Sequence, residues 1–190
     1  FSHLQEEQKK YGIQSGIGAT QHFCQDMLIG FELGWGGLLK KIQHYRQVNP
    51  QSTEFYDGLE DVILGVQDWM RRHVEASRKM AKKERNPELR RNLRKMADMN
   101  ERLISDPPRT FREVCQWTAW YQMIARMYNG SGSMGQLDNW LLPYYEKETA
   151  IGTLTDEEAI FHLACLLLSD TQYYQLGGPA TDGKDLTNKV

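Results

Sequence analysis

A long apolar stripe with helical spacing constrains the fold of this chain more than any other feature. Between Phe55 and Val74 the apolar residues recur at intervals of one, three or four, which places them on one face of an α-helix. The pattern predicts an amphipathic helix that continues as a polar helix to about Glu84. Helical signals dominate the rest of the chain and strand signals are almost absent, so we expect a mainly α structure.

Two more helices are indicated in the first half of the chain. Asn86-Pro87 is typical of an N-cap with proline in the first turn, and the helix that follows is expected to stop before Asp106. A helix from about Thr20 to Tyr45 is expected to contain four glycines: Gly30, Gly34, Gly36 and Gly37. Each interior glycine costs up to ~1 kcal/mol relative to alanine, which indicates close backbone packing along this helix.

Two capping boxes open the apolar helices of the second half. In Thr110–Glu113, and again in Thr155–Glu158, the threonine hydroxyl and the glutamate carboxylate can each satisfy an orphan backbone amide. The first helix is expected to end near Tyr128. The second, through Leu168, is apolar nearly all round and is therefore predicted to be buried.

Nothing in the sequence divides the chain into separate domains. The glycine-rich segment 129–135 is predicted to be a loop between helices, and Thr171–Leu176 a short strand. With 190 residues and no repeat or linker, the chain fits one domain or part of a larger protein. The longest strong apolar run, Ala159–Leu168, is too short to span a membrane, and no signal peptide is expected. Three scattered cysteines favour a reducing compartment and hence a cytoplasmic location: Cys24, Cys115 and Cys165.

Positive charge is concentrated in one segment. Between Arg71 and Lys95 there are eleven Lys or Arg and three Glu, a local balance of +8, although the whole chain has a formal net charge of −2. Such a segment can contact nucleic acid, but this one has no interleaved aromatics and no base-reading module. We interpret it as the solvated face of a helical hairpin. The alternative is a non-catalytic helical interaction module that binds an anionic partner.

Candidate chemistry is sparse. His22 and Asp26 are four residues apart, so on a helix they share one face; they suit hydrogen bonding to an oxygenated substrate or, equally, a helix pair or cap. No further ligand at a suitable spacing supports a metal site. The serines of the 130–135 loop can line a pocket, although the loop lacks the ending of a phosphate-binding loop. Cys115 and Cys165 are expected to be inert core residues.

Several segments match motifs of one family, in the family's order. The closest match is Pro107–Trp117, and it is followed by Gly135–Tyr145, Gly152–Ala159 and Leu176–Asn188. Upstream, His22–Leu38 contains a histidine, an aspartate four residues later and two glycines three residues apart. In these motifs the chain resembles the glycyl radical enzymes, the pyruvate formate-lyase family, over nearly its whole length.

The resemblance implies a larger enzyme built around a ten-stranded α/β barrel, of which residues 1–190 form one helix-rich part. In this family a radical S-adenosylmethionine activase installs a radical on a backbone glycine. The radical passes to a cysteine, which abstracts a hydrogen atom from the substrate. The motifs of that cysteine and that glycine are not visible here, so both are expected downstream of Val190. This chain is then expected to hold no catalytic residue, bound cofactor or metal.

The resemblance also implies which residues bind the substrate. His22 corresponds to a histidine that binds substrate in the dehydratase-like members. Ser131 or Ser133 falls where a serine contacts substrate, and the segment with Tyr173 and Tyr174 matches one pocket wall. The chain departs from the family pattern at position 136, where glutamine replaces the usual arginine.

The implied function is that of an anaerobic radical lyase or dehydratase acting on a small hydroxylated or carboxylated metabolite. The pairing of His22 with Asp26 favours this branch over a formate C-acetyltransferase-like acyltransferase, which is the alternative within the family. We expect the full-length protein to be a homodimer that binds its activase and a small-molecule substrate. We expect it to bind neither nucleic acid nor a membrane.

Overall fold

A computed structural model describes residues 2–12, 25–128, 133–169 and 173–190 of the chain. Most of these residues are helical, which confirms the mainly α prediction for this part of the chain. The elements follow in the order α1 (Ser2–Lys10), α2 (Met27–Val48), a 3₁₀ turn (Pro50–Ser52), α3 (Thr53–Lys83), α4 (Pro87–Leu103), α5 (Phe111–Tyr128), β1 (Ser133–Gln136), α6 (Leu137–Ala150), α7 (Asp156–Ser169) and β2 (Tyr173–Gln175).

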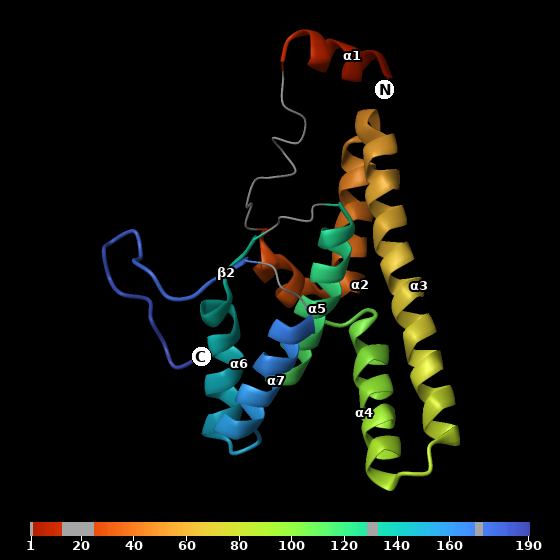
Figure 1. Cartoon of the computed structure of the whole chain (residues 1–190). Coiled ribbons are helices and arrows are strands. Elements are labelled where there is room, and N and C mark those ends of the chain that lie inside the picture. Colours follow the sequence, from red (N-terminus) through yellow and green to blue (C-terminus); the bar gives the residue numbers. More distant parts are fainter. Residues whose placement is uncertain (1, 13–24, 129–132, 170–172) are drawn as a thin grey trace.

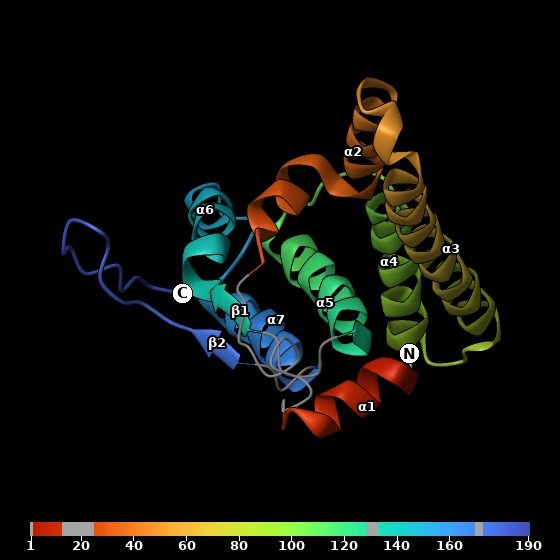
Figure 2. The same cartoon turned by 90° about the horizontal axis from the view of Figure 1, so that it is seen from above.

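Helix α5 lies at the centre of the arrangement. Helices α6 and α7 lie on one side of it, and the long α3–α4 hairpin lies on the other (Figure 1). The view from above shows α2 bridging the two sides (Figure 2). Helix α3 packs against α2 and against α4, so the hairpin is anchored mainly through α2 and projects at its far end.

The predicted starts of α4, α5 and α7 agree with the structure because the predicted caps form. In the first capping box, the Glu113 amide donates to Thr110 Oγ1 at 3.2 Å and the Thr110 amide donates to Glu113 Oε2 at 3.3 Å. The second box repeats this pattern between Thr155 and Glu158, at 3.2 Å and 3.1 Å. Asn86 Oδ1 accepts the first free amides of α4. Each cap satisfies donors that would otherwise lack a partner at a helix start.

Trp117 of α5 occupies the centre of the core. Only 1% of its surface is exposed. Its ring stacks on that of Trp35 of α2 with 4.8 Å between the ring centroids, and it forms a T-shaped pair with Phe31 with 5.4 Å between the centroids. A Cβ at Gly30 would lie 2.1 Å from the Trp117 ring. The glycine at position 30 therefore lets α2 approach α5 closely enough for these aromatic contacts.

A second glycine in α2 allows contact between two backbones. Gly34 has a φ of 62° and interrupts the helix, and a Cβ there would lie 2.5 Å from the backbone of Asp106 and Pro107. Two residues later, the Gly36 amide donates to the Ser105 carbonyl at 2.9 Å. The close backbone packing predicted from these glycines is confirmed, and it joins α2 to the turn between α4 and α5.

We expect Gly34→Ala to destabilise the protein by about 2 kcal/mol or more, because the new Cβ meets backbone and the φ is left-handed. The matched control is Gly65→Ala in α3, where a Cβ would meet nothing within 4 Å. That change is expected to stabilise by about 0.5–1 kcal/mol, since alanine favours helix. Urea unfolding of both variants measures the difference, and equal midpoints would contradict the packing argument.

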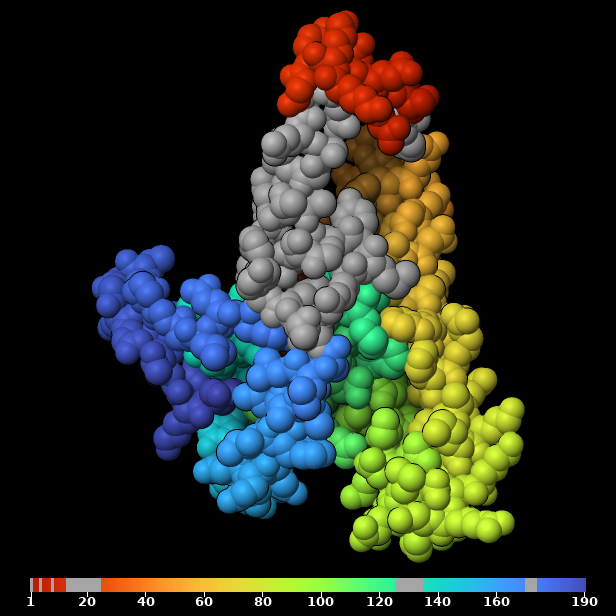
Figure 3. All heavy atoms as spheres, viewed as in Figure 1, coloured from red at the N-terminus to blue at the C-terminus, as the bar shows by residue number. Residues whose placement is uncertain are grey.

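Helix α7 is less buried than its sequence predicts. Ala159 and Leu166 are buried on the side that packs against α5, but Phe161 is 64% exposed and Leu168 is 86% exposed. Figure 3 shows α7, in light blue, at the surface of the molecule. The prediction of a helix buried all round is therefore wrong for this chain, because none of its described elements covers the outer face of α7.

Candidate functional site

Strands β1 and β2 bring two distant segments of the chain together. They pair in parallel, with Ser133 opposite Tyr173 and Gln136 opposite Gln175, and with an irregularity between these two pairs. The prediction of a loop over 129–135 is wrong for residues 133–135, which belong to β1. The short strand predicted within Thr171–Leu176 is confirmed as β2. Ser133 and Tyr173, two candidate substrate residues, are thus neighbours in the sheet.

Tyr174, a third candidate, is held from the helix side of the sheet. Its hydroxyl accepts a hydrogen bond from Gln122 Nε2 at 2.5 Å, and its side chain packs against the core. Gln122 belongs to α5 and is fully buried. Its Oε1 is buried too and has no partner among the described residues. Sequence reasoning missed Gln122, because α5 contains several polar residues and nothing in the sequence marks this one as buried.

A buried polar cluster lies where both strands end. Asp138 is only 4% exposed, and its Oδ2 accepts from the Gly177 amide at 2.9 Å and from Asn188 Nδ2 at 3.1 Å. Asn188 Nδ2 also donates to Asn139 Oδ1 at 3.1 Å. Gln136 Nε2 donates to the Gly177 carbonyl at 3.0 Å. This cluster ties the segment after β2 to the start of α6, and so fixes the carboxyl ends of the two strands.

We expect Asp138→Ala to lower the free energy of unfolding by about 2–4 kcal/mol, because the Gly177 amide and the Asn188 side chain lose a charged acceptor in a buried position. Asp68→Ala is the control, since Asp68 is exposed and its ion pair with Arg72 at 3.2 Å spans one helical turn. Removing it should cost less than about 0.5 kcal/mol. Chemical denaturation of both variants distinguishes the cluster from a surface contact.

The remaining candidates are placed as follows. His22 and Ser131 lie outside the described residues. Asp26 is the N-cap of α2, and its Oδ1 accepts from the Ile29 amide at 3.3 Å. Helix α2 therefore begins at Met27, and the prediction of a helix from about Thr20 is wrong over residues 25 and 26. The cap, one of the two roles open to Asp26 from the sequence, is confirmed.

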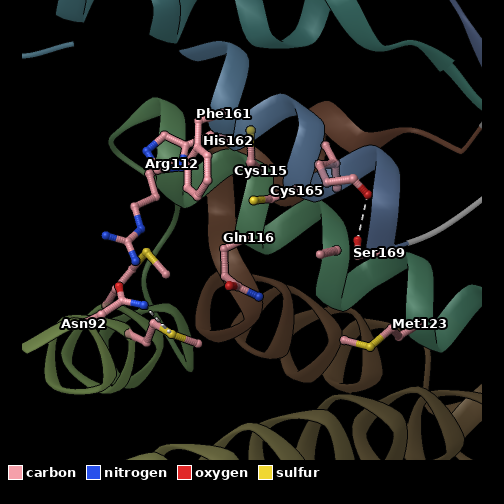
Figure 4. A pocket seen from close by; sticks show the side chains of 13 residues that line it. Asn92, Arg112, Cys115, Gln116, Met123, Phe161, His162, Cys165 and Ser169 are labelled. Carbon is pink, nitrogen blue, oxygen red and sulfur yellow. Dashed lines mark hydrogen bonds between the residues drawn. The ribbon is translucent and has the colours of Figure 1, made fainter. Parts of the chain in front are cut away.

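The two described cysteines, Cys115 and Cys165, differ in their exposure to solvent. Cys115 is buried, and burial together with the nearby Cys165 raises the pKa of its thiol to about 12, so it is inert at neutral pH. Cys165 is exposed on α7, so the prediction that it is a core residue is wrong. The cause is the open space between α4 and α7, onto which Cys165 faces (Figure 4). Among the described residues no three His, Cys, Asp or Glu side chains are grouped to hold a metal ion.

The basic segment forms the surface of the α3–α4 hairpin. All its Lys and Arg side chains are exposed except the half-buried Arg78. Arg78 pairs with Glu101 and, at 3.3 Å, with Asp98 on α4, which holds the two helices together. The interpretation as a solvated helix face is confirmed for this chain. No helix in the described part of the chain is long and apolar enough to cross a membrane.

Comparison with known proteins decides the family. A family model described as Pyruvate formate lyase-like matches residues 11–190. The chain belongs to this family. The resemblance of its motifs to glycyl radical enzymes is therefore confirmed, and it covers nearly the whole chain.

Two curated relatives in the family are similar to this chain over most of its length. It is 27% identical to the isethionate sulfite-lyase of Nitratidesulfovibrio vulgaris, over 75% of this chain and 20% of that protein. It is 35% identical to the indoleacetate decarboxylase of Tractidigestivibacter scatoligenes, over 80% of this chain and 19% of that protein. The chain thus spans about a fifth of the length of these relatives.

A solved structure shares the fold. The glycerol-bound B12-independent glycerol dehydratase from Clostridium butyricum matches with a TM-score of 0.82 at 18% identity, over 90% of this chain and 25% of that chain. The likeness confirms the expected fold class, a helix-rich part of a glycyl radical enzyme barrel. At this identity it carries the fold alone.

Proposed function

We propose that this chain forms part of the substrate-chamber wall of an anaerobic glycyl radical lyase or dehydratase. Its substrate is a small hydroxylated or carboxylated metabolite. The observation that carries the proposal is the parallel pairing of β1 with β2, which sets Ser133 opposite Tyr173. The family resemblance assigns both positions to the substrate pocket. The curated relatives named above, a lyase and a decarboxylase, support this reaction class.

In the described part of the chain, helix α5 contacts one face of the sheet, and we propose that the other face lines the chamber. Tyr174 lies on the α5 side, and successive residues of a strand alternate between the two faces of a sheet. We assign the substrate to the face opposite α5. In this arrangement Tyr174 and Gln122 hold the wall in place from behind, and the polar cluster around Asp138 fixes its end.

His22, Ser131, Ser133 and Tyr173 are the residues proposed to bind the substrate, and Tyr174, the fifth candidate, is proposed to contribute to the wall from behind. An imidazole and a hydroxyl can hydrogen-bond a substrate hydroxyl or carboxylate and assist loss of a hydroxyl group. Walls that hold the substrate in one orientation and exclude water keep a reactive intermediate from side reactions. This chain would contribute that binding and exclusion.

The radical chemistry itself is proposed to come from elsewhere in the polypeptide. A glycyl radical, once installed, supplies hydrogen-atom abstraction through a cysteine. Neither described cysteine suits that role, because Cys115 is buried with a raised pKa and Cys165 is exposed on the side of α7 that faces α4 and α5, not on the strands. We therefore place the catalytic cysteine and the radical glycine beyond Val190. The remaining proposals are a radical S-adenosylmethionine activase as partner, a homodimer and a cytoplasmic location.

Electron paramagnetic resonance tests the proposed function directly. The full-length protein is incubated anaerobically with its activase, S-adenosylmethionine and a reductant, and is expected to acquire an organic radical on a glycine. Isethionate, indoleacetate and glycerol are the first candidate substrates to assay, because the names of the similar proteins identify these compounds as their substrates. A full-length protein that never acquires a radical, with an activase proven on another enzyme, would contradict the proposal.

A further inference from the structure

Helix α3 lies at the edge of the molecule, with α2 and α4 on its inner side (Figure 1, Figure 2). Its inward residues, among them Ile63, Met70 and Val74, are buried. The residues on the opposite side are exposed, and we call that side the outer face of α3. In the described part of the chain it is a helix surface without a partner.

Charge along α3 is divided between the two halves of the helix. Residues 53–70 include five Asp or Glu and no Lys or Arg, whereas residues 71–83 include six Lys or Arg and one Glu. The helix macrodipole favours acidic residues near the start of a helix and basic residues near its end, but only within the first and last turns. In this 31-residue helix the division reaches Asp68 and Arg71 near the middle, so it has another cause.

The charges on the inner side of α3 are paired with its neighbours. Glu60 pairs with Arg46 of α2 at 3.3 Å, and Arg78 pairs with Asp98 of α4 at 3.3 Å. Other charges lie exposed on the outer face and form no ion pair with any residue in the described ranges: Glu54, Asp61, Lys79 and Lys83. This second set is therefore available to a partner.

The spacing of the outer charges suits a second copy of α3. They follow one another at intervals of 7, 18 and 4 residues, close to two, five and one turns of helix, so they lie along one face. In an antiparallel pair with its two-fold axis near position 70, Asp61 lies opposite Lys79 of the second copy. Glu54 lies within one turn of Lys83 of that copy, which the long lysine side chain spans. Each ion pair forms twice, because the axis repeats it.

Exposed apolar side chains accompany these charges. Val62 follows Asp61 and is 53% exposed, and Met80 follows Lys79 and is 59% exposed. The same two-fold axis brings Val62 of one copy beside Met80 of the other. Apolar contact then contributes affinity, while the charges set the antiparallel orientation and oppose a parallel one.

We propose that the outer face of α3 is the two-fold interface of the full-length homodimer, in which two α3 helices pair antiparallel. The observation that identifies the occupant is that the outer face is complementary to itself, as an interface between identical copies requires. The proposal rests on the homodimer of the proposed function, whose surface it names, and is independent of the radical reaction.

Charge reversal in the full-length protein tests the interface. Variant A carries Lys79→Glu and Lys83→Glu. Variant B carries Glu54→Lys and Asp61→Lys. Each homodimer would bring like charges together, so we expect both variants to raise the dimer Kd at least about tenfold in sedimentation equilibrium. A full-length protein that is monomeric, or a dimer that neither variant weakens, would overturn the proposal.

The control variant carries Arg90→Glu and Arg94→Glu. Both arginines are exposed on α4, so this variant has the same change of net charge on the same hairpin but outside the interface. Its Kd should equal that of the unchanged protein. If it weakens the dimer as much as variant A does, net charge and not the outer face of α3 governs association, and the proposal falls.

Mixing variants A and B provides a rescue that misfolded proteins would not show. In variant A the proposed contact positions are all acidic, and in variant B they are all basic, so one copy of each restores every ion pair. We expect a heterodimer with a Kd close to that of the unchanged protein. Because salt screens exposed charges, this heterodimer should weaken between about 0.1 M and 1 M salt. Variants that stay apart after mixing would overturn the proposal.

The interface and the reaction fail in different ways. If no radical forms but variants A and B associate on mixing, the interface stands and the proposed reaction falls. If the radical forms in a dimer that ignores both variants, the reaction and the homodimer stand and this interface falls.

Discussion

Trp117→Ala is expected to destabilise the protein by about 3–5 kcal/mol, the range found when a large aromatic side chain is removed from a packed core. The indole contacts Trp35 and Phe31 of α2 and stacks at 5.8 Å on Tyr121 of its own helix. The truncated side chain would leave a cavity where α2 and α5 meet. Gly30, which is a glycine to make room for this ring, would then face empty space.

Chemical denaturation with tryptophan-independent detection, such as far-ultraviolet circular dichroism, measures this loss. Phe55→Ala is the control, because Phe55 is 62% exposed and an exposed aromatic contributes little. We expect its midpoint to stay close to that of the unchanged protein. A similar midpoint for Trp117→Ala would show that the aromatic contacts do not hold α2 against α5.

The second large effect concerns turnover. In the activated full-length enzyme, His22→Ala is expected to lower kcat/KM by about 10²- to 10⁴-fold, the usual contribution of a positioned acid–base group. The proposal that this imidazole binds the substrate hydroxyl or carboxylate predicts that the radical yield stays unchanged, because His22 has no part in activation. Steady-state kinetics and the radical signal are measured on the same preparation.

His44→Ala supplies the matched control. His44 lies exposed on α2, so its loss should leave both turnover and radical yield as they are. Unchanged kinetics in His22→Ala would refute the assignment of this residue. A loss of the radical together with turnover would instead show that the variant disturbs the structure, and His22→Gln, which keeps a hydrogen-bonding side chain, would then be the next variant.

Local signals in the sequence predicted the helices well. The stripe from Phe55 to Val74 and the capping boxes act over one or two turns, so they hold whatever surrounds them. A close contact along α2 was also predictable from its glycines. Glycine weakens a helix, so its presence there indicates that another part of the chain packs too closely for a side chain. The helices depend on residues near in sequence, whereas the partner of Gly34, the backbone of Asp106 and Pro107, is distant in sequence and was not predictable.

Features that depend on distant residues were not predictable. The strand at 133–136 has no alternating apolar pattern and exists because β2 lies beside it. The burial of α7 was overestimated because its apolar residues contact α5 on one side only. The cluster around Asp138 joins α6 to residues after β2, and Gln136 belongs to it. No local sequence pattern predicts contacts between residues this far apart in the chain.

The length of β1 and β2 has a consequence for the order of folding. Four residues in one strand and three in the other make a sheet that is marginal by itself. Since α6 and α7 intervene between the strands, the pairing of β1 with β2 is a non-local contact, and such contacts form slowly. During synthesis on the ribosome, the helices can therefore assemble before the residues proposed to meet the substrate are brought together.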